Sequence, residues 1–172
     1  EKQLLEQAMI AEEAMLLNSK VTNSEGATRS FSKNTLSIIN SKGFNATFTK
    51  TFHSISSIAI AGKDTNMQRD YDYSAAIHFD DLKNPIEVGE KAGERAASRL
   101  NSKKIKSSNV DVLFEPRIAK SLLSSLASCI SGSSIARGTS FLSKKINTMI
   151  CDESITIANM SQLPRGLGSV PF

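Results

Sequence analysis

The side chains with the greatest capacity for chemistry in this sequence are two histidines, His53 and His78. His78 and Asp80 lie two positions apart, so an extended strand would place them on one face and allow a weak cation site. Neither histidine has a second histidine at the helical spacing typical of zinc ligands, and the only carboxylates close to either are Asp80 and Asp81, which follow His78. Because zinc and calcium sites need more convergent ligands than these, we interpret both histidines as hydrogen-bonded structural or surface residues.

The second half of the chain contains glycine and serine motifs that match catalytic loops only in part. Gly132 and Gly138 have the spacing of a phosphate-binding loop, but the lysine that should follow the second glycine is absent. Gly166 and Gly168 precede no helix signal, which excludes a dinucleotide-binding turn. Ser128 lacks the flanking glycines of a nucleophile elbow. These residues by themselves therefore predict no active site.

The composition is that of a globular protein, with 172 residues of which 40% are hydrophobic and 22% are charged. No apolar run approaches the roughly 20 residues that a membrane-spanning helix needs. The net charge is +4, and the basic excess lies after residue 100, beginning with the lysines of residues 103–106. Basic charge can attract nucleic acid, but no aromatic pattern for base stacking accompanies it. We favour a solvated loop and expect neither a nucleic-acid nor a membrane partner.

Two cysteines, Cys129 and Cys151, are too few for a disulfide framework in a chain of 172 residues. Their neighbours are small or apolar, so we expect two reduced, buried thiols and a cytoplasmic protein. No signal-peptide pattern is visible. Both ends look cut, and we expect the chain to be the interior of a longer protein.

Residues 20–80 indicate a β-sheet, because Thr, Ser, Ile and Phe dominate between closely spaced turn residues. We expect an antiparallel meander, since the connections are too short for crossover helices. The expected turns lie at residues 23–26, 41–43 and 62–66, and the last strand at residues 69–79. Phe44 and Phe48 alternate with polar residues, which predicts one buried face of the hairpin. Asp70 and Asp72 are expected to be solvated.

Two helices are expected to flank this sheet. Residues 1–17 have the apolar periodicity of an amphipathic helix. Residues 84–87 (Asn-Pro-Ile-Glu) begin the second one with an asparagine cap, a proline at the first position and a glutamate able to reach back to the cap. Its buried face is expected to comprise Val88, Ala92, Ala96 and Leu100. Gly89 and Gly93, on an adjacent row, predict close packing against a neighbouring element.

The second half begins after a lysine-rich linker at residues 101–109. We expect a strand at residues 110–114, a helix from Pro116 to Gly132 with a buried apolar stripe, a short helix at residues 138–146 and a strand at residues 155–158. The fold class is therefore α+β: an antiparallel β meander with flanking helices, followed by the start of a second mixed, β-rich domain. We expect the domains at residues 1–105 and 106–172.

Several stretches occur in an order and spacing that resemble one protein family. They are residues 22–27 (TNSEGA), 66–71 (NMQRDY), 88–96 (VGEKAGERA), 114–117 (FEPR), 131–132, 135–142 (IARGTSFL), 155–157 and 164–169 (PRGLGS). Together they resemble the TldD/PmbA family, once named modulators of DNA gyrase. The resemblance implies that the chain holds the family's central domain and the start of its C-terminal domain.

The resemblance also implies a function, because the family is linked to cytoplasmic metalloproteolysis of unfolded or leader-bearing peptides, including peptide maturation, by two related subunits. TldD-type subunits carry H-E-x-x-x-H, whose histidines bind zinc and whose glutamate acts as general base. In the register anchored on residues 138–140, the motif positions fall on Leu123, Ser124 and Ser128, and residues 79–172 contain no histidine. The chain is therefore similar to the PmbA/TldE branch. Its structural loop motif after the helix would be Arg137, Gly138, Thr139 and Ser140.

This resemblance predicts a non-catalytic subunit of a metallopeptidase, inactive alone and without a cofactor of its own. Zinc is expected on a TldD-like catalytic partner, with which the protein would form a hetero-oligomer, and a homodimer is the other expected assembly. The substrate would be a peptide. Two alternatives stay open: an independent nucleic-acid- or gyrase-binding module that uses the basic second half, and an active hydrolase whose ligands lie further along the protein.

Overall fold

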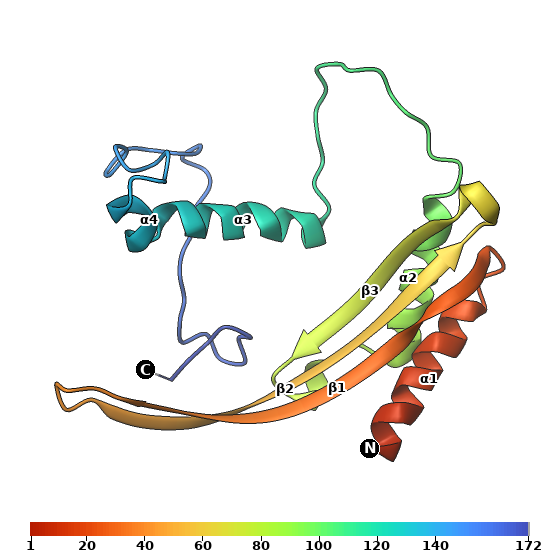
Figure 1. Ribbon diagram of the computed structural model, residues 1–172, viewed down its shortest axis with the longest axis horizontal. Helices are drawn as coiled ribbons and strands as arrows, with labels where there is room; N and C mark the ends of the chain where they lie inside the picture. The colour runs from red at the N-terminus through yellow and green to blue at the C-terminus, as the bar shows by residue number, and fades with distance from the viewer. Residues whose placement is uncertain (172) are drawn as a thin grey trace. The chain divides into compact units, whose positions relative to one another are not determined.

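The computed structural model describes residues 1–171, which form two compact units. The first comprises Glu1–Lys104 together with the segment that begins at Met160, and the second comprises Ile105–Asn159. The elements in chain order are α1 (Lys2–Leu16), β1 (Val21–Ile39), β2 (Asn45–Ala61), the 3-10 helix η1 (Asp64–Asn66), β3 (Gln68–Ala76), the 3-10 helix η2 (Phe79–Asp81), α2 (Pro85–Ser98), α3 (Pro116–Ile130) and α4 (Gly132–Ala136) (Figure 1). None of the described helices is long and apolar enough to cross a lipid bilayer.

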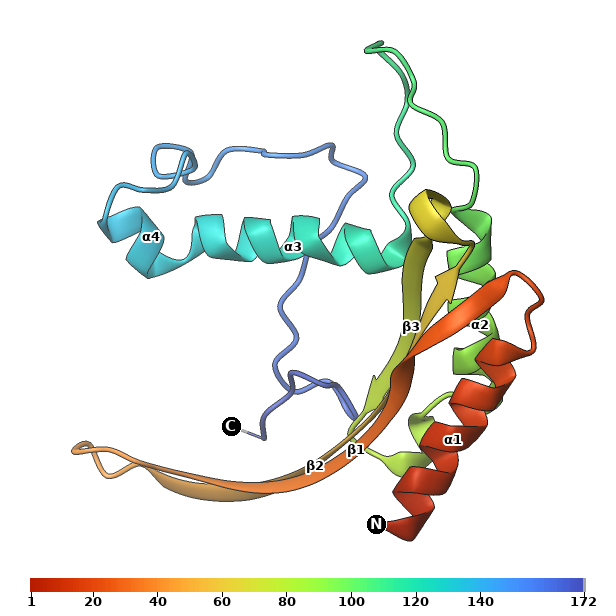
Figure 2. The same cartoon turned by 45° about the vertical axis from the view of Figure 1, so that its right-hand side comes forward.

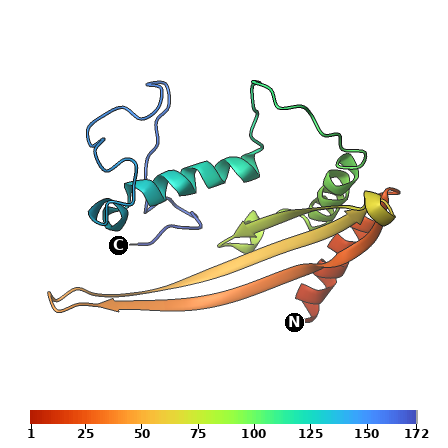
Figure 3. The same cartoon turned by 45° about the horizontal axis from the view of Figure 1, so that its top comes forward.

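The first unit is built on a three-stranded antiparallel sheet in the order β1-β2-β3. β1 and β2 form a long hairpin around a tight turn, where Asn40 Oδ1 accepts hydrogen bonds from the backbone N–H groups of Lys42 and Phe44. β3 pairs with β2 only over residues 53–61, so the hairpin continues beyond the sheet as two strands (Figure 3). We call this two-stranded part, residues 32–52, the distal hairpin.

α1 and α2 pack side by side on one face of the sheet (Figure 2). They lie close together because α2 presents a glycine to α1: a Cβ atom at Gly89 would lie 2.0 Å from the carbonyl oxygen of Ala11. The buried core between helices and sheet consists mainly of small side chains, namely Ala11, Met15, Ile55, Ala59, Ala61, Val88, Ala92 and Ala96. The predicted buried face of α2 and the close packing of its glycines are confirmed, with Leu100 partly buried at the margin.

The first unit departs from the sequence prediction at both ends of its sheet. The turn expected at residues 23–26 is wrong, because β1 continues through this segment. The pairing of β1 with β2 shifts in register there, between Val21 and Asn23 and between Ser24 and Gly26. Gly26 has the positive φ that suggested a turn, +100°, but it serves a bulge and does not reverse the chain. The last strand ends at Ala76 and not at residue 79, since the chain then enters η2.

The start of α2 follows the expected capping pattern in part. The side-chain oxygen of Asn84 accepts a hydrogen bond of 3.0 Å from the backbone N–H of Ile86, as predicted. Glu87 does not reach back to the cap, and its carboxylate instead lies 3.6 Å from the Lys83 ammonium group. Whether Glu87 faces the cap or Lys83, its carboxylate places a negative charge in the first turn of α2, where the helix dipole favours it.

The described part of the second unit contains helices and turns, and neither of its expected strands. Residues 110–114 and 155–158 do not form strands, and residues 138–146 form turns where a helix was expected. α3 covers the predicted range, but none of its residues is buried, and Gly132 opens α4. A strand needs a neighbour to pair with, and an apolar stripe needs a surface to cover it; the described residues of this unit supply neither. The α+β class with a three-stranded antiparallel sheet and flanking helices is confirmed.

Candidate functional site

The three positions that the resemblance aligns with a zinc motif lie on α3 and are exposed. The Leu123 side chain retains 55% of its accessible surface. The hydroxyl of Ser124 donates to the Lys120 carbonyl at 3.2 Å, and that of Ser128 donates to the Ser124 carbonyl at 3.0 Å. Positions 123 and 128 are about 140° apart around a regular helix, so the structure does not bring these side chains together. The two hydroxyls are used within the helix itself.

The expected loop motif, Arg137–Ser140, lies at the end of α4. Gly138 has φ +67° and donates its backbone N–H to the Ile135 carbonyl at 3.0 Å. The backbone N–H of Thr139 donates to the Ser134 carbonyl at 3.1 Å. These contacts terminate a helix through a glycine in the left-handed conformation. The motif therefore shapes the chain, and the buried Ser140 hydroxyl accepts the next bond, from the backbone N–H of Leu142.

The described residues contain no group of three or more His, Cys, Asp or Glu side chains placed to hold a metal ion. The His78 and Asp80 pair, a weak cation site by sequence, gains no third ligand among residues 1–171. Cys129 and Cys151 are free thiols, and Cys151 is exposed, so its expected burial is wrong.

One polar side chain of the first unit with several contacts is Arg29, which the sequence did not single out. It lies on β1 and is only 8% exposed. Its Nε donates to Gln7 Oε1 on α1 at 2.8 Å, and its Nη1 donates to the backbone carbonyls of Ser54, at 3.1 Å, and of Ser30. The guanidinium carbon lies 5.5 Å from the centroid of the Phe79 ring, a cation–π distance. Arg29 thus joins α1, the hairpin and η2.

His53 lies beside Arg29 at the point where β3 ends. Its Nδ1 is 3.4 Å from Arg29 Nη2, and its ring lies between those of Phe31, at 4.9 Å, and Phe79, at 6.0 Å. Burial lowers the pKa of the His53 imidazole, and the charges of Arg29 and His78 lower this pKa further. A neutral imidazole can accept the hydrogen bond from Arg29 through Nδ1. The interpretation of His53 as a hydrogen-bonded structural residue is confirmed.

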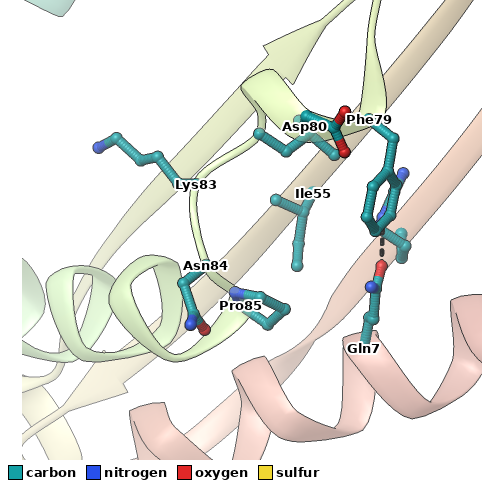
Figure 4. A pocket seen from close by; sticks show the side chains of 9 residues that line it. Gln7, Ile55, Phe79, Asp80, Lys83, Asn84 and Pro85 are labelled. Atoms are coloured by element: carbon teal, nitrogen blue, oxygen red, sulfur yellow. Dashed lines mark hydrogen bonds between the residues drawn. The ribbon is translucent and has the colours of Figure 1, made fainter.

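A cavity of about 280 Å³ opens next to Arg29 (Figure 4). Gln7 enters it from α1, Asn84 and Pro85 from the start of α2, and Phe79 from η2. Its walls combine apolar side chains with amide, guanidinium, carboxylate and ammonium groups, and a mixed lining of this kind is typical of a small binding pocket. Asp80 and Lys83 also line the cavity, and the Lys83 ammonium group pairs with Asp72, at 3.4 Å, and with Glu87, at 3.6 Å.

Two carboxylates on the helix-facing side of β3 contradict the expectation that they are solvated. Asp70 and Asp72 are 5% and 4% exposed. Asp72 pairs with Arg95 of α2 and with Lys83, whose ammonium group is 3.4 Å away. Asp70 pairs with Arg99 at 3.1 Å. These buried carboxylates join α2 to the sheet and therefore have a structural role. The alternation of side chains along a strand predicts that Asp70 and Asp72 share one face of β3. The structure adds that α2 covers this face.

Two family models match the chain in succession. Residues 1–100 match the PmbA/TldA metallopeptidase central domain, and residues 107–172 match the PmbA/TldA metallopeptidase C-terminal domain.

Curated relatives match over nearly the whole chain. The metalloprotease PmbA homologue of Haemophilus influenzae is 32% identical over 97% of this chain, and that of Buchnera aphidicola (from Acyrthosiphon pisum) is 36% identical over 89%. Metalloprotease PmbA of Escherichia coli O157:H7 is 32% identical over 98% of the chain. The chain spans 37%, 34% and 38% of the lengths of these three relatives, respectively.

Two solved structures share the fold. A candidate modulator of DNA gyrase from Bacteroides thetaiotaomicron superposes with a TM-score of 0.79 and 26% identity, over 88% of this chain and 35% of that one. A candidate modulator of a DNA gyrase from Thermotoga maritima gives a TM-score of 0.80 and 24% identity, over 99% of this chain and 40% of that one.

Proposed function

Because this chain belongs to the PmbA/TldD metallopeptidase family, we propose that it is part of a non-catalytic PmbA/TldE-type subunit of a two-subunit zinc metallopeptidase. The complex would degrade or mature unfolded or leader-bearing peptides in the cytoplasm. The catalytic, zinc-binding subunit would be a TldD-like partner. The chain covers little more than a third of its relatives, so this activity is proposed for the whole protein.

One observation carries the proposal: the chemistry of the side chains at the aligned motif positions. Leu123 offers only a hydrocarbon side chain, and the hydroxyls of Ser124 and Ser128 donate to carbonyls of their own helix. A serine hydroxyl is a poor zinc ligand and a poor general base compared with imidazole and carboxylate. Residues 79–172 contain no histidine, so a shift of the register by a residue or two would not restore the motif.

The proposal assigns the protein a positioning role in the complex. The first unit is a rigidly connected scaffold, in which Arg29 ties α1 to the hairpin and the Asp70 and Asp72 ion pairs tie α2 to β3. Such a scaffold can hold a substrate peptide or complete the chamber around a partner's active site without taking part in the chemistry.

The test uses the full-length protein and the H-E-x-x-x-H paralogue from the same organism, purified separately. Bound zinc and cleavage of an unfolded casein substrate are measured for each protein and for the mixture. We expect neither zinc nor cleavage for the full-length protein alone, and faster cleavage by the mixture than by the paralogue alone. Zinc and cleavage by the full-length protein alone would overturn the proposal.

A matched control separates the roles of the two subunits in the mixture. In this control the motif glutamate of the paralogue is replaced by glutamine, which removes the general base and retains the zinc ligands. We expect this mixture to be inactive. Cleavage that persists would show that the full-length PmbA/TldE-type protein supplies its own catalytic groups.

A further inference from the structure

Arg29 carries a buried positive charge whose partners among residues 1–171 are all neutral. Only 8% of the residue is exposed, and a guanidinium group stays protonated in proteins. Its partners are an amide, two backbone carbonyls, an imidazole and an aromatic ring, from Gln7, Ser30, Ser54, His53 and Phe79. Burial of a charge is unfavourable unless an opposite charge accompanies it. Arg29 therefore lacks the counter-ion that a buried arginine normally has.

The guanidinium group also keeps one N–H for a further acceptor. It has five N–H donors. Nε uses one on Gln7, Nη1 uses two on the carbonyls of Ser30 and Ser54, and Nη2 uses one on His53 Nδ1, across a long 3.4 Å. The second N–H of Nη2 has no acceptor in the described part of the chain. Since Arg29 lines the cavity of about 280 Å³, this donor is available to a group bound there.

The acidic side chains around the cavity do not supply the missing charge. Asp72 is engaged by bases of its own, and Asp81 pairs with Arg165 at 2.9 Å. Asp80 lines the cavity but makes no ion pair with any described residue, and it is exposed, so water screens its charge. Asn84 and Pro85, at the opposite wall, begin α2, whose first turn carries a partial positive charge. The inner end of the cavity therefore favours an anion.

The rest of the lining favours an anion with an apolar body. Ile55, Phe79, Leu82 and Pro85 line the cavity beside the polar groups (Figure 4). Its volume lies just below the range of pockets for drug-sized ligands, which leaves room for a group of about one amino-acid residue. An inorganic anion would use the guanidinium group and leave the apolar walls in contact with water. A carboxylate attached to an apolar group would use both.

We propose that this cavity binds a carboxylate carried by an apolar body of about one residue in size. The carboxylate would accept a charge-assisted hydrogen bond from Arg29 Nη2, and the body would lie against Ile55, Leu82 and Pro85. Two sources have this chemistry, namely a free small carboxylic acid and the C-terminal residue of a peptide. The proposal concerns binding alone and does not depend on the metallopeptidase assignment.

The test is a calorimetric titration of the full-length protein with N-acetyl-leucine. Its control is N-acetyl-leucinamide, which has the same body without the negative charge. We expect a dissociation constant on the order of 1 mM or lower for the acid. The amide should bind at least about tenfold more weakly, because the charge-assisted hydrogen bond is lost. Equal binding of acid and amide would overturn the proposal, and so would equally tight binding of inorganic sulfate, which cannot use the apolar walls.

Three variants test the assigned side chains. Arg29→Met should weaken binding of the acid at least about tenfold. Arg69→Met is the matched control, because it removes the same group from an exposed position outside the cavity, where Arg69 pairs with Glu25; it should change binding less than about twofold. Asp80→Asn removes the carboxylate that faces the same cavity and should tighten binding about twofold. A folding defect in Arg29→Met cannot account for a gain of affinity in Asp80→Asn.

A short peptide of Gly and Ser that ends in leucine distinguishes the two sources. It is titrated with a free C-terminal carboxylate and, as its control, with an amidated end. Binding of the free-ended peptide without binding of N-acetyl-leucine assigns the cavity to a peptide terminus, and the reverse assigns it to a small acid. Binding of neither would overturn the proposal, as would equal binding by the unaltered and Arg29→Met proteins or weaker binding by Asp80→Asn. Because no cleavage is measured, a failure here is separate from a failure of the proposed function.

Discussion

Replacing Gly89 by alanine is the sharpest perturbation of this fold, because the close approach of α1 and α2 depends on that position. A Cβ atom there would lie 2.0 Å from the Ala11 carbonyl oxygen, 2.9 Å from its carbonyl carbon and 3.1 Å from Ala14 Cβ. The first two atoms belong to the backbone of a helix, so no side-chain rotation can relieve the clash. The two helices must move apart, and the contacts of Ala11 and Val88 in the core must loosen with them.

The magnitude follows from two opposing effects. Overpacking of a well-packed interior costs roughly 1–3 kcal/mol, and the backbone clash places Gly89→Ala at the upper end of that range. Alanine is favoured over glycine inside a helix by about 1 kcal/mol. The expected net loss is about 2 kcal/mol in the free energy of unfolding, which is a large part of the stability of an ordinary domain.

Gly93→Ala is the matched control on the same face of α2, one turn later. There a Cβ atom would lie 3.1 Å from the Met15 carbonyl oxygen, 3.3 Å from Asn18 Cβ and 3.4 Å from Val21 Cγ2. These contacts need shifts of only a few tenths of an ångström, so the gain in helix propensity should offset most of the cost. Urea unfolding of the full-length protein, followed by circular dichroism, measures both variants. The reasoning is refuted if Gly89→Ala is as stable as the unaltered protein, or if Gly93→Ala is destabilised equally.

Three further predictions concern named side chains. Arg29→Met should lower the free energy of unfolding by roughly 1–2 kcal/mol, since it leaves the partly buried acceptors on Gln7 and Ser54 without their donor; unchanged urea unfolding would contradict this. Burial, together with the charges of Arg29 and His78, lowers the pKa of His53 in the folded state, so the unfolded chain takes up a proton at a higher pH than the folded chain does. The free energy of unfolding is therefore highest above the ordinary histidine pKa of about 6.5 and declines as the pH falls below it. His53→Gln should flatten this decline in urea unfolding between about pH 7 and pH 5, and an unaltered slope would count against it. The double replacement Ser124→Ala with Ser128→Ala should leave cleavage by the mixed subunits within about twofold, because both hydroxyls are bound within α3; a larger loss would assign these serines a part in the chemistry.

The sequence alone determined the elements whose signals are local. The asparagine cap and proline at the start of α2 act within one helical turn, and the turn around Asn40 acts within five residues, so both were predictable from residue types. The spacing of Gly89 and Gly93 predicted a close contact with a neighbouring element, but the sequence did not identify α1 as that element. The lack of histidine after residue 78 is likewise a property of the sequence, and it carries the proposed function.

Tertiary structure decided which faces are covered and which charges meet. Asp70 and Asp72 alternate with tyrosines along β3, a pattern that a solvated or a covered face would share. The docking of α2 buries both carboxylates and pairs them with Arg99 and Arg95, respectively. Arg29 stands in an unremarkable polar run, and its role depends on a glutamine 22 residues earlier and a carbonyl 25 residues later. The same limit explains the two absent strands, because residues of strand type pair only where a neighbour is present. Local patterns set which conformation a segment prefers, and long-range packing sets which of its groups are buried, paired or left open to a ligand.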